Sequence, residues 1–170
     1  MKSQTNIRLR AMEPEDLDAL YRIENDASLW GVGTTNVPYS RYTLHDYIAN
    51  SSGDIYTDRQ VRLIVEEEGG RLLGLVDLVN FDPRHCRAEV GIVIEQPFRG
   101  CGYARAALIQ LQQYAAQVLH LHQLFAIIAV NNQQALRLFE NLGYRRTAAL
   151  SDWLFDGHAF SDGVMVQLIL

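Results

Sequence analysis

Several features that mark particular protein classes are scarce or missing in this chain of 170 residues. It has only two cysteines, Cys86 and Cys101, without the CxxC spacing or the neighbouring histidines of a zinc site. No run approaches the roughly 20 apolar residues that span a bilayer, and the first residues lack the apolar stretch of a signal peptide. We therefore expect a reduced, cytoplasmic setting, with no membrane and no metal.

Positive charge is scarce as well. The net charge is −5, and Arg145-Arg146 is the only pair of adjacent basic residues. A nucleic-acid surface normally shows a basic patch or stripe, so we expect no nucleic-acid partner. Apolar residues make up 48% and charged residues 21%, which is typical of a folded globular protein. The length and the absence of a linker predict one domain over residues 1–170.

Hydrophobic periodicity predicts a mixed α/β fold. Helix signals occur from residue 13 to about 26, at 41–50, directly after residue 102 and at 133–142. Strand signals alternate with them and lie at 7–10, 61–66, 72–80, 87–95, 123–130, directly after Tyr144, near Trp153 and at 164–170. A Gly-Gly hairpin signal joins the second and third of these strands.

The most informative segment is 89–104, where an apolar strand runs through a glycine-rich turn into a helix. Gly100 and Gly102 let the backbone adopt unusual dihedrals and point several N–H groups at one anion. The start of the helix adds its positive dipole end, and Arg99 can add a full charge. The segment therefore predicts a phosphate-binding turn. It is not a Gly-x-Gly-x-x-Gly fingerprint, because Arg105 replaces the third glycine, and the chain has no P-loop Gly-Lys-Ser or Gly-Lys-Thr.

Two motifs resemble the GNAT superfamily of N-acetyltransferases. Arg99, Gly102 and Ala104 match its acetyl-CoA signature, which reads Arg or Gln, two residues, Gly, one residue, then Gly or Ala. Residues 132–144 resemble its second cofactor segment, Asn-x-x-Ala-x-x-x-Tyr-x-x-x-Gly-Phe. Three less specific segments, 9–17, 87–89 and 156–165, are similar to the branch that holds ribosomal-protein N-terminal and spermidine or diamine acetyltransferases.

The resemblance implies the fold and the reaction. It implies a central, mostly antiparallel sheet that is splayed at the middle strands and flanked by helices. It also implies direct transfer, in a ternary complex, of an acetyl group from acetyl-CoA to a primary amine. The acceptor is a small-molecule amine, polyamines included, or a protein N-terminus, and self-association stays open. The alternative is a CoA-binding module with little or no catalysis.

The same resemblance implies which residues contact acetyl-CoA. The backbone of the central strand would pair with the pantetheine arm, the glycine turn would hold the pyrophosphate, and the later motif would complete the site. These cofactor positions are Ile92, Val93, Ile94, Arg99, Gly100, Cys101, Gly102, Tyr103, Ala104, Asn132 and Phe139. Asn132 is also a candidate helix cap, with Asn131 as another, and Cys101 is also a small residue that fills the turn.

Glu89 is the predicted catalytic residue. An alkylamine has a pKa of about 10.4 and must lose a proton before it attacks. Glu89 stands where this branch of the family carries a general base, acting directly or through water. Its alternative role is an ion pair with Arg84 or Arg87. Glu95 lies on the same strand face but nearer the turn, so we expect it in solvent or in a salt bridge.

Phe139 departs from the family pattern. The resemblance implies a tyrosine there, which protonates the departing CoA thiolate, and a phenyl ring has no proton to give. Water, Asn132 or another tyrosine could substitute, or the thiolate could leave unaided, since a thiol has a pKa near 8.5. Tyr103 and Tyr144 are two such tyrosines, and we expect both to pack rather than to act as acids.

The acceptor pocket is expected to involve three segments: the loop at 30–39, the following helix with Tyr42 and Tyr47, and the turn at 156–162. Their aromatic side chains could stack on an amine, although core packing accounts for most of them equally well. Residues 31–44 contain no Asp or Glu, whereas spermidine acetyltransferases carry acidic residues in the corresponding region. This difference counts against a polyamine acceptor and especially against a polyamine effector site.

Overall fold

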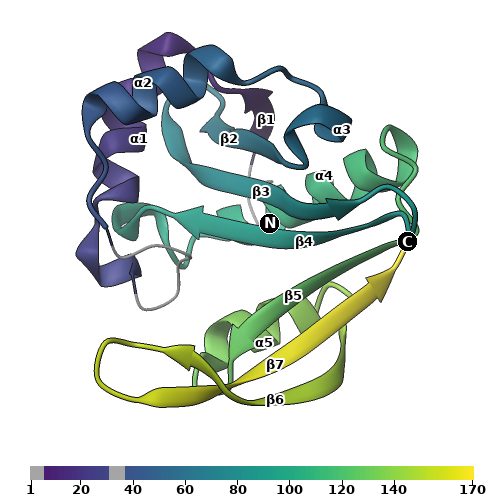
Figure 1. The fold of residues 1–170 in the computed structure, drawn as a ribbon. Coiled ribbons are helices and arrows are strands. Elements are labelled where there is room, and N and C mark those ends of the chain that lie inside the picture. The colour runs from purple at the N-terminus through teal and green to yellow at the C-terminus, as the bar shows by residue number, and fades with distance from the viewer. Residues whose placement is uncertain (1–5, 31–36) are drawn as a thin grey trace.

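The computed structural model describes residues 6–30 and 37–170 (Figure 1). Most of the acceptor loop predicted at 30–39 lies outside the described residues. The helices and strands are, in chain order, β1 (Ile7–Ala11), α1 (Leu17–Glu24), α2 (Arg41–Asn50), α3 (Ile55–Asp58), β2 (Val61–Glu67), β3 (Leu72–Asp82), β4 (Arg87–Ile94), α4 (Tyr103–Gln117), β5 (Gln123–Ala129), α5 (Gln133–Glu140), β6 (Arg145–Phe155) and β7 (Phe160–Ile169).

The strands form one seven-stranded sheet in the order β1-β2-β3-β4-β5-β7-β6. Neighbouring strands are antiparallel except β4 and β5, which are parallel because α4 connects them across one face. The mostly antiparallel sheet with helices on both faces confirms the predicted fold class. In Figure 1, α1 and α2 cover the half of the sheet that holds β1 to β4, and α5 lies behind β5 and β7.

Two hydrophobic clusters hold these layers together. The smaller joins α1 and α2 to the sheet, and its buried members are Leu20, Ile23, Leu44, Ile64 and Leu75. The larger packs α4 and α5 against the opposite face, with Leu108, Leu111 and Leu136 fully buried. Strand alternation divides β4 between the clusters, since Ile92 packs on the larger and Val93 on the smaller. The side chains of β4 therefore contribute to both faces of the sheet.

The structure differs from the sequence-based expectation in two places. The strand expected after Tyr144 and the one expected near Trp153 are a single strand, β6, interrupted by two register shifts in its pairing with β7. Most of β6 is exposed, so it lacks the alternation that would have marked it as continuous. The short helix α3 was not predicted; Asp54 caps it by accepting a hydrogen bond from the Tyr56 N–H.

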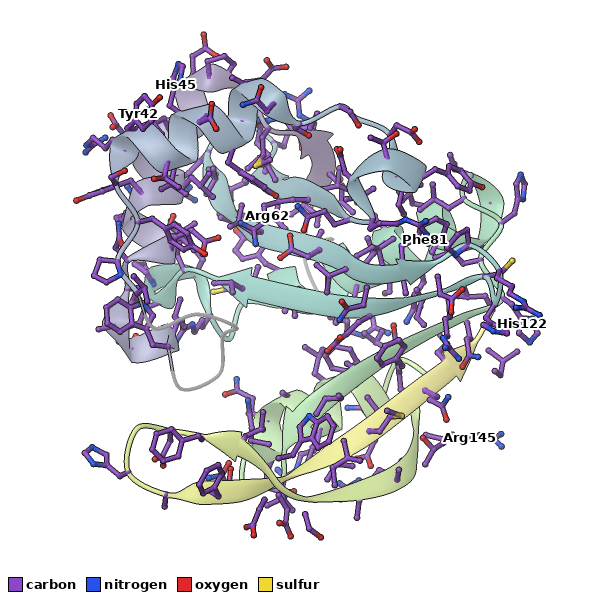
Figure 2. All side chains as sticks on the ribbon, in the orientation of Figure 1. Tyr42, His45, Arg62, Phe81, His122 and Arg145 are labelled. Carbon is purple, nitrogen blue, oxygen red and sulfur yellow. The ribbon has the colours of Figure 1, made fainter. Side chains whose placement is uncertain are left out.

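Tyr42 and Tyr47, both expected at the acceptor pocket, point in different directions from α2. Tyr42 is 81% exposed and lies on the outer side of the helix together with His45 (Figure 2). Tyr47 turns inward, joins the smaller cluster and accepts a hydrogen bond from Gln60 at 3.2 Å. Of the two, only Tyr47 faces the sheet.

Candidate active site

The strands β4 and β5 separate in the middle of the sheet. Their pairing consists of three residue pairs, Arg87–Gln123, Ala88–Leu124 and Glu89–Phe125. Beyond Glu89 the two strands diverge, as Figure 1 shows. The β5-facing backbone of residues 90–94 is thus left to bind an extended ligand arm by strand-like hydrogen bonds. The splay expected of the sheet is confirmed, and Ile92, Val93 and Ile94 lie along it.

The glycine turn stands between the end of β4 and the start of α4. Gly100 has φ +76° and Gly102 has φ +87°, a left-handed region that favours glycine. Gly102 is the residue directly before α4, and no side chain caps the helix there. The first backbone N–H groups of a helix have no intrahelical acceptor, so they and the helix dipole can bind an anion. The geometry fits a pyrophosphate.

Arg99 and Cys101 complete the turn. The Nε of Arg99 donates to the carbonyl oxygen of Ile94 at 2.8 Å, which ties the turn back to the end of β4. The thiol of Cys101 lies 3.6 Å from the carbonyl oxygen of Arg99. Both side chains are exposed, and the thiol takes part only in the local geometry of the turn. Cys101 therefore lies within the turn, and its contact with acetyl-CoA stays a prediction.

A side-chain network ties the turn to the hairpin between β2 and β3. The Tyr103 hydroxyl, at the first residue of α4, donates to Glu67 Oε1 at 2.6 Å. Arg71 also binds Glu67, and its guanidinium lies 4.9 Å from the centre of the Phe98 ring. The hydrogen bond from Tyr103, together with the ion pair to Arg71, lowers the pKa of Glu67. The hydrogen bond to Glu67 raises the pKa of Tyr103, and the nearby charge of Arg71 opposes that rise. Tyr103 therefore anchors the turn.

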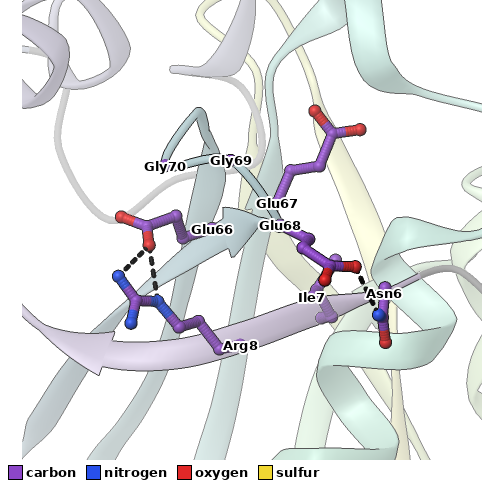
Figure 3. A pocket seen from close by; sticks show the side chains of 8 residues that line it. All are labelled: Asn6, Ile7, Arg8, Glu66, Glu67, Glu68, Gly69 and Gly70. Carbon is purple, nitrogen blue, oxygen red and sulfur yellow. Dashed lines mark hydrogen bonds and ion pairs between the residues drawn. The ribbon is translucent and has the colours of Figure 1, made fainter.

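A hollow of about 360 Å³ lies on the other side of the same hairpin (Figure 3). Its lining includes Glu66, Glu67 and Glu68. Glu66 is buried and bound by Arg8 and Arg10, so its charge is already balanced within the protein. The hollow lies at the β1 edge of the sheet, away from the splay, and we assign it no part in the reaction.

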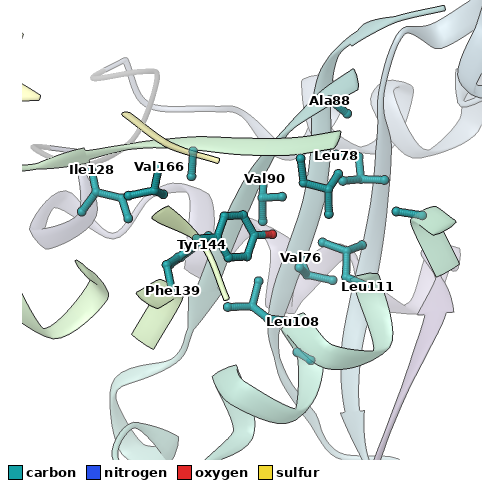
Figure 4. Close-up of a cluster of buried hydrophobic side chains, with 14 of the residues drawn as sticks. Val76, Leu78, Ala88, Val90, Leu108, Leu111, Ile128, Phe139, Tyr144 and Val166 are labelled. Carbon is teal, nitrogen blue, oxygen red and sulfur yellow. The ribbon is translucent and has the colours of Figure 1, made fainter. Parts of the chain in front are cut away.

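The second motif forms the start and the inner face of α5. Asn132 is the N-cap, its Oδ1 accepting a hydrogen bond from the Ala135 N–H at 3.2 Å, so the alternative cap at Asn131 was wrong. Phe139 is 3% exposed and packs edge-on against Tyr144 with ring centres 4.9 Å apart (Figure 4). The ring at the position of the family's acid is thus part of the core.

Tyr144 cannot take over the acid step. Its hydroxyl is buried without a hydrogen-bond partner among the described residues. Burial raises the pKa of Tyr144 to about 12, and the nearby Gln112 amide offsets this only in part. A phenol in this setting holds its proton tightly in the core between α4 and α5. The expectation that Tyr144 packs is confirmed.

Glu89 lies on the sheet face toward α1 and α2, at the last pair before the splay. Its Oε2 accepts a hydrogen bond from the Asn80 side chain at 2.7 Å. Among the described residues, Glu89 forms no ion pair with Arg84 or Arg87, which was its alternative role. Arg87 instead binds Asp82 at 3.2 Å. Glu89 is half-buried, so a ligand entering the splay can reach its carboxylate.

Glu95 makes the expected salt bridge. Arg22 of α1 holds both of its oxygens at 2.9 Å. The carboxylate beside the phosphate turn is thereby neutralised, and α1 is fixed against the end of β4. Glu89 lies within β4 and Glu95 directly follows the strand, and the two carboxylates have different partners, Asn80 and Arg22.

A charge network that the sequence did not reveal lies beside Glu89. Arg62 of β2 binds Asp77 of β3 through two hydrogen bonds of 2.8 and 2.9 Å and also binds Glu24 of α1 (Figure 2). Burial alone would lower the pKa of Arg62, but the carboxylates outweigh it and hold that pKa above its usual range. Asp77 stands directly opposite Gly91, two residues beyond Glu89.

The described residues hold neither a metal site nor a membrane-spanning helix. Residues 6–30 and 37–170 contain no group of three or more His, Cys, Asp or Glu placed to hold a metal ion. In the same part of the chain, no helix is both long and apolar enough to cross a bilayer.

The splay between β4 and β5, the glycine turn before α4 and the half-buried carboxylate of Glu89 are together the features expected of an acyl-CoA-dependent transferase. The chain belongs to the GNAT family: residues 6–145 match its acetyltransferase (GNAT) domain. It is an acetyl-CoA-dependent N-acetyltransferase, which confirms the expected family, activity and co-substrate.

Its relatives include spermidine acetyltransferases. The spermidine N(1)-acetyltransferase of Escherichia coli K12 is 30% identical over 85% of this chain and 75% of that protein. The corresponding protein of Vibrio cholerae is 28% identical over 95% of this chain and 91% of its own length. A crystal structure of the Vibrio cholerae enzyme with CoA and spermine superposes with a TM-score of 0.87, at 26% identity, over 98% of this chain and 96% of that one.

Proposed function

We propose that the chain acetylates a small-molecule primary amine that carries a further positive charge, as spermidine does. The observation that carries this proposal is the charge balance beside the splay. Glu24, Asp77 and Glu89 supply three carboxylates there, while Arg62 supplies one guanidinium. The surplus negative charge attracts a cationic acceptor. The names of the two relatives support the same substrate class.

The charges proposed to attract the acceptor come from the sheet and α1. Residues 31–44 have no Asp or Glu, so that segment adds no carboxylate of its own. We therefore expect the selectivity for charge to be modest, and diamines and monoamines to compete with spermidine.

The donor side would hold acetyl-CoA through the backbone. Gly100, Gly102 and the first turn of α4 would bind the pyrophosphate. The backbone of residues 92–94, paired with β3 but not with β5, would bind the pantetheine arm on its β5 side. Asn132, the cap of α5, and Arg99 would complete this site, as the family resemblance implies. In this position the thioester supplies an activated acetyl group at the splay.

Glu89 would act as the general base. It removes a proton from the ammonium group directly or through a water molecule, and the neutral nitrogen then attacks the thioester carbonyl. Backbone N–H groups of β4 beyond Gly91 would stabilise the negative oxygen of the tetrahedral intermediate. The C–S bond then breaks, and the nitrogen loses its second proton to solvent.

No side-chain acid is proposed for the departing thiolate. Phe139 has no acidic proton and Tyr144 is buried. The thiol has a pKa of about 8.5, so its anion leaves readily and collects a proton from water. Turnover should consequently depend more on Glu89 than on any acid.

A thiol-release assay tests the proposed function. Purified protein is given acetyl-CoA and, separately, spermidine, putrescine, butylamine, an amino acid, an aminoglycoside and N-terminal peptides. We expect release of free CoA thiol to be fastest with spermidine and slower with butylamine at equal concentration. Preference for a neutral N-terminal peptide would contradict the proposal and favour a protein acceptor.

We also propose that residues 1–170 act as one catalytic domain in the cytoplasm. The support for one domain is the single sheet, whose strands come from both ends of the described chain. The support for the compartment is the pair of unlinked cysteines, Cys86 and Cys101.

A further inference from the structure

The strand β3 is irregular next to Glu89. Its register with β4 shifts between Val79 and Asp82, which marks a β-bulge. In a regular strand Leu78 and Asn80 would point to the same face. Instead, Phe81 joins Leu78 in the core, and Asn80 appears on the opposite face beside Glu89. The bulge therefore reorients Asn80 toward the predicted base.

Asn80 also has a strained backbone. Its φ is +50°, in the left-handed region that non-glycine residues rarely adopt. Asparagine tolerates this region better than most residues but is still less stable there than glycine. Its side chain is exposed, so the hydrogen bond to Glu89 adds little to the stability of the fold. A strained residue that contributes little stability and contacts the predicted base indicates a functional constraint.

The direction of this hydrogen bond is determined by chemistry. A carboxylate only accepts hydrogen bonds, so the nitrogen of the Asn80 amide faces Glu89, at 2.7 Å from Oε2. One carboxylate oxygen is thereby occupied and the side chain is fixed in one orientation. The other oxygen, Oε1, is left for the acceptor amine or its bridging water.

We propose that Asn80 is a positioning residue that orients Glu89 for proton abstraction. The inference rests on the proposed role of Glu89. The neighbouring arginines do not orient Glu89, because each binds other carboxylates. Arg87 binds Asp82, and Arg62 binds Asp77 and Glu24. On the β5 side, the partner of Glu89 is Phe125, which has no hydrogen-bonding side chain. Asn80 is thus the side chain that holds the carboxylate in place.

The test replaces Asn80 by glycine, because glycine keeps the left-handed φ without strain and removes only the amide. With spermidine and saturating acetyl-CoA, N80G should lower kcat about tenfold and change KM for acetyl-CoA by less than about twofold. Its melting temperature should equal or exceed that of the wild type. N80D, which keeps the size but cannot donate from an ionised carboxylate, should lose at least as much turnover.

The double variant N80G/E89Q separates positioning from a structural role. If Asn80 acts through Glu89, N80G causes no further loss once Glu89 is replaced by glutamine. If the losses of turnover caused by N80G and by E89Q multiply in the double variant, the positioning role is overturned while Glu89 remains the base. Full turnover in N80G alone would have the same consequence. Full turnover in E89Q would instead contradict the proposed base itself, and the positioning role would fall with it.

Discussion

The proposed donor turn and the proposed acceptor face are built from different parts of the chain and by different means. The turn at residues 99–104 is continuous in sequence, exposed, and formed by backbone geometry at Gly100 and Gly102. The acceptor face is assembled from side chains of α1, β2, β3 and β4 that meet only in the folded sheet. The donor side therefore depends on local conformation, and the acceptor side depends on charge balance.

This contrast explains why the co-substrate was easier to identify than the acceptor. A backbone cradle requires glycines at fixed spacing, which leaves a readable motif. A charge network requires only that opposite charges meet, and many sequence separations satisfy that requirement. Substitutions on the two sides should accordingly fail in different ways.

The largest effect is expected from Gly102→Val. A β-branched residue is strongly disfavoured at φ +87°, and its side chain would crowd the anion site. We expect the Kd for CoA, measured by calorimetry, to rise by about 100-fold or more. The matched control is Gly53→Val, at φ +68°, where a Cβ atom would have no neighbour within 4 Å. It should show similar strain and normal CoA binding. Unchanged affinity in Gly102→Val would contradict the assignment of the turn.

Glu89→Gln tests the acceptor side directly. Loss of a general base should lower kcat about 100-fold near neutral pH, with partial recovery at higher pH as the free amine accumulates. Glu95→Gln, which removes the carboxylate directly after the same strand, should retain turnover within about threefold. A loss in Glu89→Gln that does not vary with pH would indicate a structural role.

Arg62→Met should break the charge balance without touching the donor turn. The substitution leaves the half-buried carboxylates of Asp77 and Glu24 without the guanidinium that balances them. We therefore expect the free energy of unfolding to fall by about 2 kcal/mol at neutral pH. The two carboxylates then have raised pKa values in the folded state, so the deficit should shrink as the pH falls and they bind protons.

Denaturant titrations at neutral and acidic pH measure this effect, and acetyl-CoA binding should be unchanged. The control is the triple variant in which Glu24→Gln and Asp77→Asn accompany Arg62→Met. It should recover much of the lost stability at neutral pH, because no unpaired charge remains. A deficit that grows on acidification would contradict the charge-balance argument.

The smallest effect is expected from Tyr103→Phe, which removes the hydrogen bond to Glu67 but keeps the ring. The turn loses one anchor, so the Kd for CoA should rise about threefold with kcat nearly unchanged. Tyr114→Phe, further along the same helix and packed on the core, is the control and should leave the Kd unchanged. Equal affinities in both variants would remove Tyr103 from the donor side.

Local sequence patterns predicted several elements correctly but did not decide the roles of Asn80, Asn131 and Asn132. Helix α2, the hairpin between β2 and β3 and the start of α4 follow from local periodicity and glycine positions, and all were predicted. Asn131 and Asn132 are adjacent and chemically identical, so only the backbone decided that Asn132 caps α5. Asn80 was missed because a bulge in β3 leaves no signal in the alternation of the surrounding residues.

The sequence by itself determined most of the helices and strands, the glycine turn before α4 and the family, because these depend on residues close together in the chain. Tertiary structure decided what surrounds Glu89: Asn80 as its partner, Arg87 turned to Asp82, and the network around Arg62. Tertiary structure also placed Phe139 in the core. Such contacts depend on strand register and on bulges, which join residues distant in sequence and are set only when the whole sheet has formed.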